Sequence, residues 1–271
     1  MTKQNCTHNF ITHKIFDENI IEIPKWYGIA NTFSLGNYSG EGNLFSKQKT
    51  NLKLNPGIVS QIAEKLGLSF VSAKDTKSNV CFANNTDLRT DYKTTFASID
   101  ILDYITAVLH SPTYREKHKD FLKIDFPKVP YPKNTETFWE LVNLGSKIRQ
   151  IQLLEFSKKE DYMLNFPIGG DNVVRREMNK SSLEVESIVM PQALCNEVTG
   201  EIWINDVQYF DNVPLVAWEF DNGDYMPAQK WLKDREGCEL KGEDILDYQK
   251  IIVILTETHR LINAINTIQI E

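Results

Sequence analysis

The chain has 271 residues, of which 41% are hydrophobic and 11% aromatic. This composition supplies a core for one large or two modest domains and argues against a wholly disordered protein. The formal net charge of −7 counts against a compact domain that binds nucleic acid unaided, because such domains are usually basic.

Possible metal ligands and targeting signals are sparse. The four cysteines form no CxxC pair and the five histidines are scattered, whereas structural zinc requires clustered ligands. The first ten residues, MTKQNCTHNF, lack the apolar stretch of a secretory signal, and the longest apolar run, Ile251 to Leu255, is too short to span a bilayer. We therefore expect a cytoplasmic protein with reduced cysteines, no metal site and no membrane partner.

The N-terminal third is largely irregular. Ile20 to Ile23 resembles a short strand, and the glycine-rich stretch Gly36 to Asn43 lacks the spacing of a phosphate-binding loop, so it reads as a surface loop. Asn55 and Pro56 are typical of a helix start, and Gly67 of a helix end.

Residues 72–95 are polar and form the best candidate for an internal boundary. We therefore divide the chain into an irregular N-terminal segment with one helix, residues 1–95, and a main domain, residues 96–271. The N-terminal segment is either part of the main domain or leads into it.

The second quarter is predicted to be helical. Ser98 is expected to cap a helix that runs to Leu109, where His110-Ser111-Pro112 interrupts it. A short charged helix from Thr113 to Asp120 follows. The proline-rich stretch from Phe126 to Pro132 must be extended, and a helix from Thr135, as its cap, to Leu154 comes next.

The third quarter changes to a strand-like pattern, and the chain then ends in a long helix. Four segments read as strands: Val173–Val174, Glu186–Met190, Glu201–Ile204 and Val207–Phe210. Thr199-Gly200 is predicted to be a hairpin turn between two of them. After the aromatic, turn-rich residues 211–240, the apolar spacing predicts one helix over residues 243–268. The predicted fold class is α+β (mixed α/β), with a helical N-terminal half, a small mostly antiparallel sheet and a long C-terminal helix.

The motifs of DNA-modifying enzymes are missing from the sequence. An adenine methyltransferase needs an Asn/Asp-Pro-Pro-Tyr/Phe loop, and the nearest strings, Leu54 to Gly57 and Val129 to Pro132, do not fit. No glycine-rich turn follows a strand in a way that would hold S-adenosylmethionine. No strand-framed Asp…Glu-x-Lys is present for a metal-dependent nuclease. We expect no catalytic centre in this chain.

Charge is distributed unevenly along the second half. Arg175, Arg176 and Lys180 form a small basic group, whereas Ser181 to Tyr225 contains nine acidic residues and no Lys or Arg. Positive charge returns beside aromatic residues in Gln229 to Arg235. Such groups either position a protein on DNA phosphates or form an ordinary solvated face, and composition does not decide between the two.

Several strings in order resemble a known family. They are Ile101 to Lys117, Phe121 to Pro130, Trp203-Ile204-Asn205, Gln208-Tyr209-Phe210, Val213-Pro214 with Trp218, Lys230 to Arg235, and Glu243-Asp244-Ile245 with Tyr248. Their order is similar to the C-terminal specificity domain of single-polypeptide type ISP and type IIG restriction-modification enzymes. The resemblance covers roughly Ser98 to Ile268, and the turn Asn222-Gly223-Asp224-Tyr225 departs from the family by carrying an acid where a glycine is expected.

The resemblance implies a target-recognition domain that reads double-stranded DNA in the major groove. Its other partner would be the methyltransferase and nuclease part of the same enzyme, which would also hold S-adenosylmethionine and Mg²⁺. Tyr104, Phe126 and Trp231 are expected to be core residues. The candidate DNA contacts are basic or amide side chains outside that core: Arg175, Arg176, Lys180, Gln229, Lys230, Lys233 and Arg235.

Two other functions remain open at this point. The acidic balance and the long final helix also fit a protein-interaction or scaffold module of a phage-defence complex. An enzyme of a type that the sequence does not reveal is the third possibility.

Overall fold

The computed structural model describes residues 36–37, 51–52, 54–71, 94–122, 127–153, 166, 169–179, 182–186, 198–222 and 225–271. The chain divides into two compact units. Unit 1 comprises residues 1–154 and 262–271, and unit 2 comprises residues 155–261. The functional boundary near residue 95 stays a prediction. The elements confirm the mixed α/β class, with helices in the first half, a small antiparallel sheet and a long last helix.

Helix α1 of unit 1, Pro56–Leu66, follows the local signals in the sequence. The Asn55 side chain accepts a hydrogen bond from the backbone N–H of Gly57 at 2.9 Å, and Pro56 occupies the first helical position. Gly67 ends the helix with a φ of 64°, a left-handed conformation that glycine adopts without strain.

Short strand pairs lie on either side of α1 in the sequence. β1 (Gly36–Asn37) pairs antiparallel with β2 (Asn51–Leu52), and β3 (Ser69–Val71) pairs in parallel with β4 (Thr95–Ala97). Strand β4 leads directly into the next helix. Thr95, the last residue of the polar segment expected to be a boundary, is part of a strand, because its backbone pairs with Ser69.

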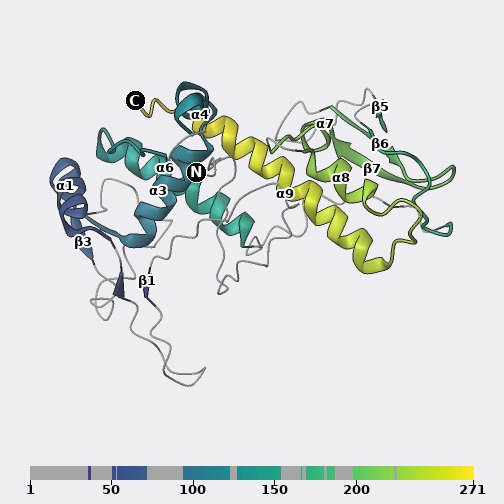
Figure 1. Cartoon of the computed structure of the whole chain (residues 1–271), viewed down its shortest axis with the longest axis horizontal. Helices are drawn as coiled ribbons and strands as arrows, with labels where there is room; N and C mark the ends of the chain where they lie inside the picture. The colour runs from purple at the N-terminus through teal and green to yellow at the C-terminus, as the bar shows by residue number, and fades with distance from the viewer. Residues whose placement is uncertain are drawn as a thin grey trace, which may run out of the picture. The chain divides into compact units, whose positions relative to one another are not determined.

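The core of unit 1 is the packing of α3 (Ser98–His110) against α6 (Thr135–Gln152) (Figure 1). Gly145 allows the close approach, since a Cβ there would lie 1.9 Å from the backbone oxygen of Asp103. The Arg149 guanidinium donates to the buried Asp103 carboxylate at 2.6 and 3.0 Å. Burial nevertheless raises the pKa of the Asp103 carboxyl, and Arg149 offsets this rise only in part.

Two predicted helix caps are wrong by one residue. Ser98 is the first residue of α3, and its N-terminus is closed by Asp100, whose carboxylate accepts from the backbone N–H of Ala97 at 2.7 Å. Asn134 caps α6 and accepts from the backbone N–H of Thr137 at 2.8 Å. Thr135 instead donates its hydroxyl to the backbone oxygen of Leu66 at 2.9 Å.

The predicted charged helix consists of two pieces. They are α4 (Pro112–Lys117) and α5 (Lys119–Leu122), which are separated by His118. In α4, the Thr113 hydroxyl donates to the Asn266 side chain at 2.6 Å. Glu271 forms an ion pair with Lys117 and a hydrogen bond with His118 at 2.8 Å. The C-terminal residues of the chain are thereby tied to α4 within unit 1.

Unit 2 contains an antiparallel sheet in the order β5-β6-β7 (Figure 1). The strands are β5 (Leu183–Glu186), β6 (Thr199–Trp203) and β7 (Tyr209–Pro214). The predicted turn at Thr199-Gly200 is wrong, because both residues lie inside β6. Gly200 is buried opposite Val213, next to a shift in register, which is a common place for glycine in a strand.

The core of unit 2 lies between this sheet and the helices α7 (Leu215–Trp218), α8 (Pro227–Lys233) and α9 (Gly242–Asn266). α9 belongs to unit 2 as far as Leu261. Its apolar residues Tyr248, Ile252 and Leu255 are buried in this core. This part of the apolar stripe of α9 is therefore buried within unit 2.

Three sequence expectations could not be compared with the fold. The strand at 20–23, most of the strand at 186–190 and residues 72–93 lie outside the described residues. No helix in the described ranges is long and apolar enough to cross a membrane.

Candidate nucleic-acid interface

A short segment, residues 171–176, carries the basic residues Arg175 and Arg176 and is hydrogen-bonded to two other parts of unit 2. On one side, Val174 exchanges backbone hydrogen bonds with Gly237 and Cys238, at 2.8 and 3.0 Å. On the other side, the backbone N–H groups of Arg175 and Arg176 both donate to the oxygen of Ile204, at 2.7 and 3.0 Å. The segment thus connects the turn between β6 and β7 with the residues that follow α8.

Arg175 is exposed and paired with Asp171, four residues earlier in the chain. Its guanidinium donates to the Asp171 carboxylate at 2.9 Å and through a second, shorter contact. The hydrogen bond from Arg175, helped by one from the Val173 N–H, lowers the pKa of Asp171 to about 2. The pair therefore stays fully charged at neutral pH.

Arg176 lies over an aromatic ring at the end of the central strand, β6. Its guanidinium carbon is 5.3 Å from the centre of the Trp203 ring, which stacks on Tyr209 at 4.5 Å between centroids. Glu184 on β5 contacts the same guanidinium at 3.2 Å, and Asp206 lies 3.9 Å from it. Cation–π and ionic contacts hold Arg176 at the surface of the sheet.

On α8, the three predicted residues Gln229, Lys230 and Lys233 have different environments. Lys230 forms an ion pair with Asp234 at 2.6 Å, whereas Lys233 is exposed and forms no ion pair with any other described residue. Gln229 is half-buried, and its amide nitrogen donates to the backbone oxygen of Trp218 at 3.0 Å. This contact favours a structural role for Gln229.

Arg235 stacks on the ring of Trp231, with 3.6 Å between the guanidinium carbon and the ring centre. Its Nε also lies 3.7 Å from the Asp244 carboxylate, and one terminal nitrogen donates to the backbone oxygen of Trp231 at 3.2 Å. Trp231 in turn packs on Tyr248 and the core of unit 2. Of the candidate cations that the structure describes, Arg235 therefore has the most contacts that fix its side chain.

Two of the expected core aromatics can be placed. Tyr104 is buried, and Trp231 is partly buried against the core. Lys180, Phe126 and Asp224 lie outside the described residues, so the expectations for them stay predictions.

The sequence did not reveal a buried amide network beneath the turn between β6 and β7. Asn205 and Gln208, which flank the tip of this turn, are both buried. The Gln208 side chain accepts from the backbone N–H of Asn172 at 2.8 Å and donates to the Asn172 side chain at 2.6 Å. Asn205 donates to the Gln208 side chain at 3.1 Å. The network joins residues more than 30 positions apart, which local sequence patterns cannot indicate.

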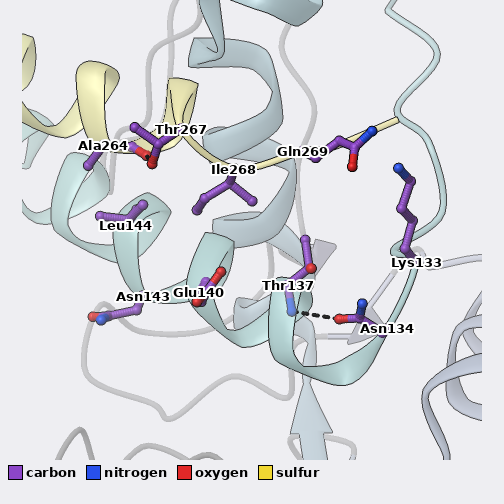
Figure 2. Close-up of a pocket in the computed structure, with 10 residues that line it drawn as sticks. All are labelled: Lys133, Asn134, Thr137, Glu140, Asn143, Leu144, Ala264, Thr267, Ile268 and Gln269. Carbon is purple, nitrogen blue, oxygen red and sulfur yellow. Dashed lines mark hydrogen bonds between the residues drawn. The ribbon is translucent and has the colours of Figure 1, made fainter.

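Unit 1 contains a shallow hollow of about 630 Å³ between α6 and the end of the chain (Figure 2). From α6 it is lined by Thr137, Glu140, Asn143 and Leu144, and Ile268 projects toward this helix from the C-terminal segment (Figure 2). Its lining mixes polar and apolar side chains and contains none of the candidate DNA contacts. Among the residues described, no cluster of His, Cys, Asp or Glu has a geometry suited to a metal ion.

The likeness to solved structures extends over much of the chain. The structure "ATP-dependent Type ISP restriction-modification enzyme LlaBIII bound to DNA" aligns with a TM-score of 0.50 and 14% identity, over 87% of this chain and 13% of that one. The "DrdV-DNA complex" aligns with a TM-score of 0.45 and 20% identity, over 64% of this chain and 18% of that one. A nuclease-deletion mutant of the Type ISP enzyme LlaGI with a DNA substrate mimic gives a TM-score of 0.40 and 18% identity, over 62% and 14%. This chain therefore spans less than a fifth of the length of any of the three.

Sequence comparison identifies the family. No curated protein matches the chain. The family model described as "Type ISP C-terminal specificity domain" matches residues 2–264. Since this match covers nearly the whole sequence, the chain belongs to the family of Type ISP C-terminal specificity domains.

Proposed function

We propose that this chain is the DNA target-recognition module of a restriction-modification enzyme and performs no catalytic step itself. The observation that carries the proposal is the position of Arg175 and Arg176 on a segment that is hydrogen-bonded to Gly237 and Cys238, shortly after the helix α8 with its two lysines. Membership of a specificity-domain family supports the same role. Guanidinium and ammonium groups on one compact unit can bind successive phosphates of a duplex.

The catalytic steps belong, in this proposal, to other parts of the enzyme. The similar structures are of restriction-modification enzymes or DNA complexes, and the chain covers only 13% to 18% of their lengths. A methyltransferase part would bind S-adenosylmethionine and a nuclease part would bind Mg²⁺. The enzyme would act where chromosomal and invading DNA meet, in the cytoplasm.

The ion pairs of the site determine how strongly it grips DNA. Arg175, Arg176 and Lys230 each contact a carboxylate, so a phosphate must replace an existing partner before it gains the full contact. With a net charge of −7, the chain should bind duplexes weakly at physiological salt and much more tightly at low salt.

Duplex binding as a function of salt concentration tests the proposal. We expect the logarithm of the affinity for a random-sequence duplex to fall linearly with the logarithm of salt concentration. Each of Arg176→Ala and Lys233→Ala should weaken binding and reduce this slope by about one unit, because each removes one phosphate contact. Lys250→Ala is the matched control, since Lys250 is an exposed lysine of α9 that pairs with Asp247.

Two results would contradict the proposal. One is that the chain binds no duplex even at low salt. The other is that Lys250→Ala changes the salt slope as much as the two site variants do. Methyl transfer or DNA cleavage by this chain alone, supplied with S-adenosylmethionine and Mg²⁺, would overturn the assignment of catalysis to other parts.

A further inference from the structure

The turn between β6 and β7 exposes two consecutive residues at its tip. The side chain of Asp206 is 98% exposed. Val207 is 65% exposed, more than any other large hydrophobic residue in the described ranges. A single exposed valine is ordinary. Here, however, the valine follows an exposed acid at the tip of a β-hairpin, and the residues that flank this pair, Asn205 and Gln208, are buried.

Hydrogen bonds from buried side chains fix the backbone of this tip. The Asn205 side-chain oxygen accepts from the backbone N–H groups of Val207 and Gln208, at 3.0 and 2.8 Å. The Asn205 amide nitrogen donates to the backbone oxygen of Val173 at 3.2 Å. The buried Asn205 side chain therefore has hydrogen-bond partners for both its oxygen and its nitrogen. These bonds, and not the exposed side chains of the tip, fix the conformation of the turn.

The neighbouring segment closes over the same network. Gly170 has a φ of 141°, and a Cβ there would lie 2.2 Å from the side-chain carbonyl carbon of Gln208. Asn172 adopts a left-handed φ of 55° while its side chain accepts from Gln208 at 2.6 Å. Such a packed polar scaffold under an exposed tip is typical of a recognition loop whose shape is fixed before its ligand arrives.

The chemistry around the tip matches the edges of DNA bases. A carboxylate accepts from the N4 amino group of cytosine, and an apolar side chain contacts the methyl group of thymine. The major groove is wide enough for a two-stranded β-ribbon. Arg175 and Arg176 lie beside the turn, because both are bonded through their backbone to Ile204 at its start. Their guanidinium groups can neutralise the phosphates that would otherwise repel Asp206.

We propose that Asp206 and Val207 enter the major groove and read base edges, with Arg175 and Arg176 holding the flanking phosphates. This inference rests on the proposed function and names the element that would carry its sequence specificity. It also separates roles within the site, because Asn172, Asn205 and Gln208 position the tip without touching DNA.

Selection from a duplex pool tests the assignment. The full chain would be used at low salt to select duplexes whose core, of about one helical turn, is randomised. Asp206→Asn should move the preference at one base pair from cytosine toward adenine, since an amide both donates to and accepts from adenine. Val207→Ala should reduce the preference for thymine at a neighbouring position. Discrimination at each affected position should change by roughly 5- to 150-fold.

The control variants distinguish a failure of base reading by the tip from a failure of DNA binding by the whole chain. Asp247→Asn and Leu246→Ala change an exposed acid and an exposed hydrophobic residue on α9 and should leave the selected sequence unchanged. An unchanged selected sequence in both tip variants, or a wild-type chain that binds duplexes without any preference, overturns base reading by the tip. A wild-type chain that binds no duplex at all overturns the proposed function as well. Tip variants that lose binding to a protein partner but keep their DNA preference would assign the tip to that partner instead.

Discussion

Both units bury polar side chains, but they use them differently. In unit 1, the buried pair Asp103–Arg149 joins α3 to α6 across their line of contact. In unit 2, the buried amides of Asn205 and Gln208 hold a turn whose own charged residue, Asp206, points into solvent. The first arrangement fixes two helices relative to each other, whereas the second fixes the shape of a surface.

The two arrangements differ in the free-energy cost of removing their polar groups from water. A buried ion pair must recover the cost of removing two charges from water, and the raised pKa of Asp103 indicates that burial outweighs the attraction of Arg149. Neutral amides have a smaller desolvation cost and can satisfy one another completely. An amide network is therefore the better support for a turn that must carry exposed charges.

Breaking the ion pair should produce the largest effect on stability. Asp103→Ala leaves the Arg149 guanidinium without its carboxylate and should lower the free energy of unfolding by about 3–5 kcal/mol. Urea denaturation followed by circular dichroism measures the change. The double variant Asp103→Ala/Arg149→Met should recover most of the loss, because an apolar pair of similar volume removes the unpaired charge. If the double variant is no more stable than the single one, the loss comes from packing rather than charge.

Removing one member of the amide network should lower the free energy of unfolding less than breaking the ion pair does. Its main effect should be a loss of local order in the β6–β7 turn. Gln208→Ala leaves the side chains of Asn172 and Asn205 short of partners and should cost about 1–3 kcal/mol. Hydrogen exchange measures the local result, and protection of the amides of Val207 and residue 208 should fall most. Equal protection in the variant and the wild type would mean that the turn keeps its shape without the network.

In the core of unit 2, one substitution should increase the free energy of unfolding instead of lowering it. The Tyr248 hydroxyl is buried and has no hydrogen-bond partner among the described residues, and burial raises the pKa of this phenol. Tyr248→Phe removes the unsatisfied hydroxyl and should raise the free energy of unfolding by about 1 kcal/mol. Thermal unfolding measures the gain. A loss of stability would show that the hydroxyl has a partner, such as a buried water molecule.

The sequence predicted the features that depend on neighbouring residues. Asn55, Pro56 and Gly67 define α1 through contacts within a few positions, and the structure confirms them. The pair Lys230–Asp234 was not predicted, although it is local, since residues four apart meet on a helix. The amide network and the pairing of Asp103 with Arg149 bring together distant parts of the chain, so no local pattern indicates them.

The incorrect predictions have the same origin. Thr199-Gly200 has the composition of a turn, but Gly200 lies in β6, where it is paired with Val213 next to a shift in register. The assignment of the candidate cations to DNA contacts stays a prediction, which was made from their charge and the family resemblance. Some of their carboxylate partners are close in the sequence, as Asp171 is to Arg175. Others, such as Glu184 beside Arg176, lie on another strand and become visible only in the folded unit.

The hydrogen bonds that shape the β6–β7 turn use none of the side-chain atoms of Asp206 or Val207. These two positions can therefore change in evolution or in the laboratory without loss of the turn that presents them. A library randomised at both positions should consist mostly of folded proteins, so new surface chemistry can arise here without compensating changes elsewhere in the unit.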